Sequence, residues 1–286
     1  MKTEYFSTRQ VAACLGVSES SLKRWCDRGV LPSIRTAGGH RRLPLSGVIQ
    51  FVRNSELDLQ RPDLIGFRRV SDSNRSSSHR NGDLHDALNR GDVESVRQSL
   101  IGRFLGGDSL AEIADRVIAP AMWKIGHQWE EGEIDIYQEH RATEIVCRIL
   151  NEMHRMLPMN YATYPHALGG APADDNYRIP TQMVEIVLAE AGWRATSLGS
   201  RLPLTSLLSA IKRDAPELVW LTISYVDNEN SLLEDLRSFA NDISANLPIV
   251  VGGRAVNDDI RDCLKNAMYC QDMRQLATFA KSLKTP

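Results

Sequence analysis

The chain has 286 residues and a formal net charge of −2, from 34 Lys and Arg against 36 Asp and Glu. This length allows two or three domains with hydrophobic cores of their own. The five cysteines are odd in number and include no C-x-x-C pair, which excludes a disulfide framework or a zinc site built on cysteines. No apolar run approaches the length of a membrane span, and residues 1–10 lack the apolar core of a signal peptide. We therefore expect a cytoplasmic protein with reduced thiols and no membrane partner.

The charge is unevenly spread along the chain. Residues 1–54 hold nine Lys and Arg against three Asp and Glu, a surplus of six positive charges. The rest of the chain therefore carries a net charge of −8. A basic head on an acidic body predicts a polyanionic partner for the head alone.

The head has the pattern of a helix-turn-helix. Ser7 is a good N-cap for a first helix that Gly16 ends, and Ser18 for a second helix over residues 19–28. The outer side of the second helix is polar and basic. Its residues are Ser20, Ser21, Lys23, Arg24 and Arg28. We expect this helix to lie in the major groove of double-stranded DNA, where Lys and Arg reach guanine edges or phosphate.

A second basic segment follows around the Gly38–Gly39 turn. It predicts a two-stranded wing against the DNA backbone, and the alternative is a solvated basic loop. The residues expected to contribute are Arg35, Gly39, His40, Arg41 and Arg42. The sequence SLKRWCDRGVLPSIRTAGGHRRL resembles the winged-helix domain of MerR-type transcriptional regulators, with R-W-x-x-x-G-x-L and T-x-G-G-H-R-R in register. The resemblance covers about residues 5–53 and implies a dimer or larger assembly that reads a paired operator.

Beyond the head, the chain divides into three further segments. Residues 55–82 are mostly polar and predict a flexible tether between a DNA-binding domain at 1–54 and the body. Residues 83–160 predict a bundle of about four helices, one of them interrupted or kinked at Pro120. Residues 161–286 alternate strands and helices, which predicts a parallel, flavodoxin-like Rossmann domain. The predicted strands are 166–172, 194–199, 218–224, 248–253 and 268–270.

Two groups of residues are candidates for a ligand site. In the bundle, Trp129 is followed by nine residues and then by Glu139 and His140, a set that suits a flat aromatic or corrin-like ligand and equally suits a packed core. In the sheet domain, ligands bind at the carboxyl ends of the strands. This rule gathers the loop 170–180, Ser224, Val226, Gly252 and Gly253 around one crevice.

The body as a whole resembles the cobalamin-binding module of light-sensing MerR-type repressors, which is similar to those of methionine synthase and corrinoid methyltransferases. The resemblance implies that Trp129, Glu139 and His140 cover the upper face of adenosylcobalamin. It implies a nucleotide-tail slot lined by the S-x-L/T and G-G elements, and a lower loop of pattern D/E-x-H-x-x-G whose histidine ligates cobalt. Here Asp175 is retained, but Tyr177 stands in place of the histidine and Pro180 in place of the glycine. A phenol with a pKa near ~10 is a poor metal ligand, so we expect no metal ligand from this chain at that position.

These observations predict a sequence-specific DNA-binding transcriptional regulator, a repressor by resemblance, with a degenerate cobalamin-type module that senses or oligomerises. One alternative is a functional light sensor that binds cobalamin or another chromophore and controls transcription, with His166 or His127 as the first substitutes for the missing ligand. A second is a corrinoid-dependent transferase or carrier, and a third is an assembly protein without a ligand. We expect no enzyme, because Ser224, His140 and Asp175 lie in separate segments and no G-x-S-x-G motif occurs. The expected partners are an operator, further copies of the chain as dimer or tetramer, and a small-molecule effector or chromophore.

Overall fold

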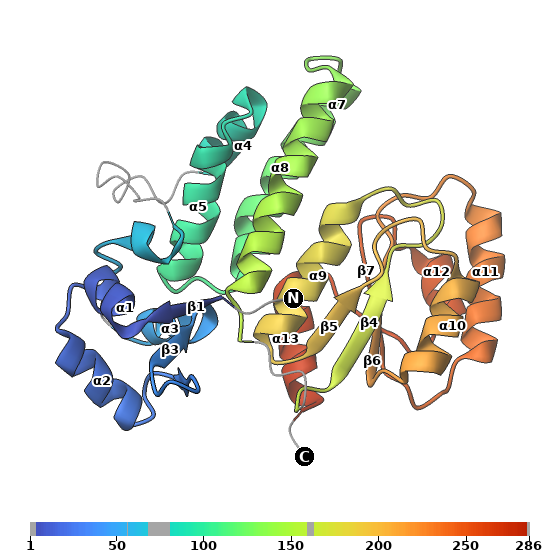
Figure 1. Cartoon of the computed structure of the whole chain (residues 1–286). Coiled ribbons are helices and arrows are strands. Elements are labelled where there is room, and N and C mark those ends of the chain that lie inside the picture. The colour runs from blue at the N-terminus through green and yellow to red at the C-terminus, as the bar shows by residue number, and fades with distance from the viewer. Residues whose placement is uncertain (1–3, 56, 68–80, 159–162, 285–286) are drawn as a thin grey trace.

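The computed structural model describes residues 4–55, 57–67, 81–158 and 163–284. Figure 1 shows three parts: a small head, a group of long helices, and a sheet domain with helices on both faces. The predicted fold class is therefore confirmed, with an N-terminal helix-turn-helix, a helical bundle and a C-terminal Rossmann-like domain.

The head contains three helices and a small antiparallel sheet. Its elements are β1 (Tyr5–Ser7), α1 (Thr8–Leu15), α2 (Glu19–Asp27), β2 (Ile34–Arg35), β3 (Arg41–Pro44) and α3 (Leu45–Arg53). Ser7 and Ser18 cap α1 and α2 as predicted, and Gly16 ends α1 in the left-handed region at φ 67°. The predicted wing of two strands gains a third, since β1 pairs with β3 and gives the order β1-β3-β2.

Part of the predicted tether is packed. Residues 62–65 form a short 3₁₀ helix, η1 (Pro62–Ile65), and the side chains of Ile65 and Phe67 are buried. The Arg61 amide donates a 3.0 Å hydrogen bond to the Cys14 carbonyl oxygen of α1. The expectation of a flexible tether is therefore wrong for residues 57–67, where the few apolar side chains are enough to fix the segment on the head. The remainder of the predicted tether, residues 68–80, lies outside the described residues.

The bundle has the four helices that the sequence predicted. They are α4 (Asn81–Arg90), α5 (Val93–Leu105), a long helix made of α6 (Leu110–Ile113), η3 (Ala114–Ile118) and α7 (Ala119–Glu130), and α8 (Ile136–Arg155). The η3 segment is a π-helical turn directly before Pro120. Proline has no N–H and crowds the preceding turn, so the predicted interruption takes the form of a local widening.

The sheet domain has five parallel strands in the order β5-β4-β6-β7-β8. The strands are β4 (His166–Gly170), β5 (Arg194–Ser197), β6 (Leu218–Thr222), β7 (Ile249–Gly252) and β8 (Met268–Tyr269). The helices are α9 (Arg178–Glu190), α10 (Leu204–Asp214), α11 (Glu229–Asp242), α12 (Asp258–Cys263) and α13 (Met273–Ser282). The order reverses between β4 and β6, which is where open α/β sheets bind their ligands.

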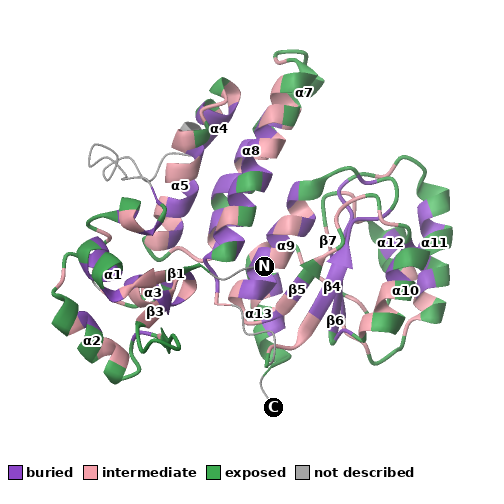
Figure 2. Cartoon of the chain, in the orientation of Figure 1, coloured by how far each residue is buried: buried purple, intermediate pink, exposed green. Residues whose placement is uncertain are grey.

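One hydrophobic core runs through the head, the bundle and one face of the sheet. It includes Leu22 of α2, Leu100 of α5 and Trp220 of β6, while the other face of the sheet packs Val219 and Leu221 in a separate core with α10 and α11. Figure 2 shows the corresponding buried residues along the inner sides of α5, α8 and the sheet. The shared core gives the three parts fixed positions relative to one another.

Candidate functional site

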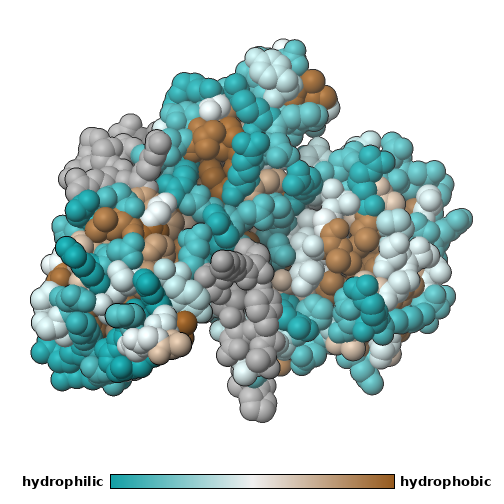
Figure 3. Space-filling model, viewed as in Figure 1, coloured by the Kyte–Doolittle hydropathy of each residue, from teal (hydrophilic) through white to brown (hydrophobic). Residues whose placement is uncertain are grey.

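The exposed side of α2 and the wing carry cations that form no ion pair among the described residues. These residues are Arg24, Arg28, Arg35 and Arg42, whereas Lys23 lies 3.5 Å from Glu19 and Arg41 is paired with Asp27. Ser20, Gly39 and His40 are exposed beside them, and Ser21 is half-buried. In Figure 3 hydrophilic residues cover the lower part of the head around α2. The arrangement leaves these guanidinium groups available for phosphates or base edges.

Arg41 lies differently from the other basic residues of the wing. Its guanidinium forms an ion pair with Asp27 and donates a 2.9 Å hydrogen bond to the Lys23 carbonyl oxygen, and only 15% of its side chain is exposed. The sequence predicted a direct contact with the DNA backbone for Arg41. The structure shows a side chain that fastens the wing to α2.

A cavity of about 1280 Å³ separates the bundle from the sheet domain. The bundle contributes residues of η3, α7 and α8, and the sheet domain contributes the carboxyl ends of β6, β7 and β8 with parts of α9 and α13. Pockets for drug-sized ligands measure roughly 300–1,000 Å³. This volume and its mainly apolar lining suit a large, flat ligand such as a macrocycle.

The three bundle residues predicted for the ligand site all line this cavity. Trp129 lies in the last turn of α7, and Glu139 and His140 in the first turns of α8. The Glu139 carboxylate lies 2.5 Å from His140 Nδ1 and accepts a 2.9 Å hydrogen bond from the Thr143 hydroxyl. The imidazole is thereby held at the cavity wall by its neighbour.

The lower loop is anchored by Asp175. Its fully buried carboxylate accepts hydrogen bonds from the backbone amides of Tyr177 at 2.8 Å, Ser224 at 2.5 Å and Tyr225 at 3.3 Å. Burial raises the pKa of Asp175, while the three amides and Arg254 oppose that rise. Asp175 therefore holds the loop to the end of β6 and does not offer its oxygens to the cavity.

Tyr177 is engaged by an arginine. Its hydroxyl accepts a 2.8 Å hydrogen bond from Arg254, whose guanidinium also lies 4.9 Å from the centre of the phenol ring. The next helix, α9, begins at Arg178, so Pro180 lies in its first turn, where a missing N–H costs nothing. Pro180 therefore belongs to the helix and not to the loop that precedes it.

The four predicted residues at the ends of β6 and β7 differ in their positions. Gly253 has φ 121°, and a Cβ there would lie 2.2 Å from the Ile223 carbonyl oxygen, so only glycine lets the ends of β6 and β7 approach. Val226 does not line the main cavity and borders a neighbouring hollow of about 530 Å³. Ser224, Gly252 and Gly253 all line the main cavity.

Thr222 and Arg254 are among the cavity residues that the sequence did not predict. The Thr222 side chain is 3% exposed, and its hydroxyl has no hydrogen-bond partner among the described residues. The sequence feature that could have identified Thr222 is its position as the single polar residue in the apolar run LVWLTI. Arg254 follows the Gly-Gly pair directly, but its contacts with Tyr177 and Ser224 join segments far apart in sequence.

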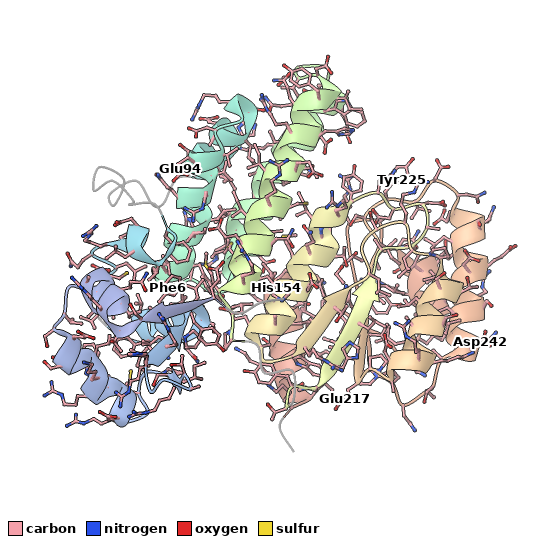
Figure 4. The ribbon with its side chains drawn as sticks, viewed as in Figure 1. Phe6, Glu94, His154, Glu217, Tyr225 and Asp242 are labelled. Atoms are coloured by element: carbon pink, nitrogen blue, oxygen red, sulfur yellow. The ribbon has the colours of Figure 1, made fainter. Side chains whose placement is uncertain are left out.

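Among the described histidines, His140 alone lines the cavity. His127 stacks on Trp123 and lies 3.3 Å from Glu131. His166 begins β4 and its amide donates a hydrogen bond to Glu217, so it lies at the amino edge of the sheet. Figure 4 shows Glu217 and Tyr225 at opposite ends of the sheet domain, and Tyr225 is the one that lines the cavity. Neither of these two histidines lines the cavity.

The size of the cavity and its wall of Trp129, Glu139 and His140 thus fit a corrinoid. The Thr222 hydroxyl, which has no hydrogen-bond partner among the described residues, could bind a polar group of such a ligand. The fit fails at one point, because the lower loop offers a phenol already bound by Arg254 and no imidazole. In the described part of the chain, no three His, Cys, Asp or Glu side chains are placed to hold a metal ion, and no helix is long and apolar enough to cross a membrane.

Two segments of the chain match families of known proteins. Residues 5–55 match a family described as a helix-turn-helix domain, and residues 81–152 match one described as a B12 binding domain. The monomethylamine corrinoid protein of Methanosarcina barkeri is 15% identical and superposes with a TM-score of 0.58 over 70% of this chain and 96% of its own, which shows a shared fold.

Two curated proteins of Myxococcus xanthus are similar in sequence. The HTH-type transcriptional repressor CarA is 22% identical over 94% of this chain and 93% of its own length. The HTH-type transcriptional repressor CarH is 24% identical over 54% of this chain, and the match spans about half of that relative, 51%. The chain therefore combines a helix-turn-helix domain with a B12 binding domain and is similar to the transcriptional repressors CarH and CarA.

Proposed function

We propose that this chain is a cytoplasmic, sequence-specific DNA-binding repressor whose body holds a corrinoid as its effector. The observation that carries the proposal is the presence in one chain of unpaired cations on α2 and the wing and of a large cavity walled by Trp129, Glu139 and His140. A helix-turn-helix reads paired half-sites as a dimer, so a homodimer or tetramer on DNA belongs to the proposal. The similarity to two repressors supports this role over that of a corrinoid-dependent enzyme.

Each cavity residue has a defined part in holding such an effector. Trp129 covers the ligand from the bundle, and Glu139 orients His140 beside it. Thr222 supplies a hydrogen bond within the cavity, and Asp175 keeps the lower loop against β6. A corrinoid supplies a redox-active and light-sensitive cobalt when it is bound.

Below the ligand, this chain presents the phenol of Tyr177 where the family pattern has the imidazole of a histidine. The Tyr177 hydroxyl oxygen already accepts a hydrogen bond from Arg254, and a phenol offers no imidazole nitrogen lone pair. We therefore propose that the lower loop forms no imidazole–cobalt bond. Regulation then follows from occupancy of the cavity rather than from light acting through such a bond.

Absorbance spectra of the full-length protein with adenosylcobalamin and hydroxocobalamin, in darkness and after illumination, test the ligand. We expect binding without the spectral change of imidazole ligation, and Tyr177→His should introduce that change. Light-dependent assembly and DNA release by the unmodified protein would contradict the proposed mode. Failure to bind either corrinoid would remove the corrinoid from the proposal.

Selection of bound fragments from a random DNA library tests the head. Arg24→Ala should weaken binding to the selected operator by about 1–3 kcal/mol if its contact with a base is bidentate, with a smaller effect on random DNA. Equal losses on operator and random DNA would show that Arg24 contacts only phosphates.

A further inference from the structure

An acidic residue stands at the start of the basic helix α2. Glu19 is the first residue of α2, and 43% of its side chain is exposed. The other two acids of the head are engaged elsewhere, since Asp27 pairs with Arg41 of the wing. Glu4 lies 3.6 Å from Arg155 of the bundle. A carboxylate on a surface that binds a polyanion weakens binding to every phosphate, so the position of Glu19 needs a compensating role.

The Glu19 carboxylate is held in place by α1. Thr8, in the first turn of α1, is only 9% exposed, and its hydroxyl donates a 2.6 Å hydrogen bond to Glu19 Oε1. Lys23, one turn further along α2, lies 3.5 Å from the same oxygen. The hydrogen bond from Thr8, together with the charge of Lys23, lowers the pKa of Glu19. The carboxylate is therefore ionised at neutral pH and has a fixed orientation.

One oxygen of Glu19 remains available to DNA. Both contacts use Oε1, and Oε2 accepts no hydrogen bond within the described part of the chain. In a helix-turn-helix, the N-terminal residues of the second helix contact base edges in the major groove. A carboxylate there accepts a hydrogen bond from the N4 amino group of cytosine and is repelled by the O6 and N7 acceptors of guanine. Adenine places its N7 acceptor beside its N6 donor, so cytosine is the better partner.

We infer that Glu19 selects a cytosine in the operator and that Thr8 is the positioning residue that directs its carboxylate toward that base. The inference rests on the proposed sequence-specific binding of DNA by α2. Glu19 then lowers the affinity for random DNA and favours a C·G pair at one position of the operator. The alternative is a structural brace between α1 and α2, which would stabilise the head without any base preference.

Selection from a random DNA library by the full-length chain, followed by substitution of each base pair in the selected operator, tests this role. The unmodified chain should require a C·G pair at one position, and replacement of that pair should weaken binding by about tenfold or more. Glu19→Gln should lose this requirement and favour A·T at the same position, because glutamine binds N6 and N7 of adenine. The variant should also bind random DNA more tightly, since it has lost a negative charge.

Glu4→Gln is the matched control, because it removes the same charge from the head while Glu4 lies beside Arg155 of α8. It should leave every base preference unchanged. Thr8→Val should weaken the preference for cytosine, and Thr8→Ser, which keeps the hydroxyl, should retain it. Thermal unfolding shows whether each variant is folded, and Glu19→Gln carries the test if the valine variant is not.

Two results would overturn the role of Glu19 and leave sequence-specific binding standing. One is an unchanged set of base preferences in Glu19→Gln. The other is an equal loss of affinity for operator and random DNA in that variant, which would assign the contact between Thr8 and Glu19 to a structural brace. An unmodified chain that selects no sequence from the library would overturn the proposed sequence-specific binding as well.

Discussion

The Arg53 guanidinium at the end of α3 lies 2.9 Å from the Glu190 carboxylate at the end of α9. Glu190 also accepts a 2.7 Å hydrogen bond from the Leu110 amide, and Arg53 lies 4.0 Å from the centre of the Phe104 ring. This single ion pair therefore joins the head, the bundle and the sheet domain. Because the first turn of α9 lines the cavity, we expect a displacement of α9 by a ligand to reach the head through Glu190.

Glu190→Gln should loosen the head from the body. The pair is largely shielded from water, with 19% and 22% of the two side chains exposed, so loss of the charge should lower the free energy of local opening by about 1–3 kcal/mol. Hydrogen exchange at the amides of α3 measures this opening. Arg155→Gln is the control, because the Arg155–Glu4 pair is more than half exposed and its loss should leave exchange in α3 unchanged. Equal protection in all three proteins would contradict the proposed joint.

Asp27→Asn should weaken DNA binding even though it removes a negative charge from the head. A simple electrostatic effect predicts stronger binding to a polyanion. The structure predicts the opposite, because Asp27 pairs with Arg41 and so fixes the wing to α2. Fluorescence anisotropy with operator DNA, at two salt concentrations, decides between the two signs. Tighter binding of the variant would show that the wing needs no such support.

His154 should make the stability of the chain fall in mild acid. The side chain is 9% exposed, and burial lowers its pKa, with no charged neighbour contributing. The imidazole, labelled in Figure 4, is thus neutral in the folded chain, whereas the unfolded chain takes up a proton near pH ~6.5. The unfolded state then binds more protons as the pH falls below that value, so the free energy of unfolding decreases by up to about 1.4 kcal/mol per pH unit.

The test compares thermal unfolding of the unmodified chain and of His154→Phe at pH 7.5 and 5.5. The variant should show the smaller decrease. Part of the decrease should persist in the variant, because burial lowers the pKa of His166 as well. An identical decrease in both proteins would assign the pH dependence to other groups.

Gly253→Ala should destabilise the sheet domain. The added Cβ would meet the Ile223 carbonyl oxygen at 2.2 Å, and the backbone at φ 121° is strained for any side chain. We expect a loss of about 2 kcal/mol or more in the free energy of unfolding, measured by urea denaturation. Gly102→Ala in α5 is the control, since a Cβ there meets nothing within 4 Å and should stabilise the helix by up to about 1 kcal/mol. Similar effects of the two substitutions would contradict the close approach of β6 and β7.

The amino-acid sequence alone determined the local elements and their order. Ser7, Gly16 and Ser18 specify the ends of α1 and α2 through their own hydrogen-bonding groups and backbone freedom, so they can be recognised without any tertiary contact. Apolar spacing likewise predicted the four bundle helices and the five parallel strands. The Trp129, Glu139 and His140 set followed from spacing along α7 and α8 together with a family resemblance.

Tertiary structure alone decided which of these side chains are free and which are engaged. Arg41 turns to Asp27, Tyr177 is bound by Arg254 from 77 residues away, and Arg53 meets Glu190 across 137 residues. The packing of residues 57–67, the position of Val226 outside the cavity and the unsatisfied Thr222 hydroxyl are of the same kind. Such contacts depend on the directions in which separate elements present their side chains. The pattern of residues along one element carries no information on what another element places opposite it.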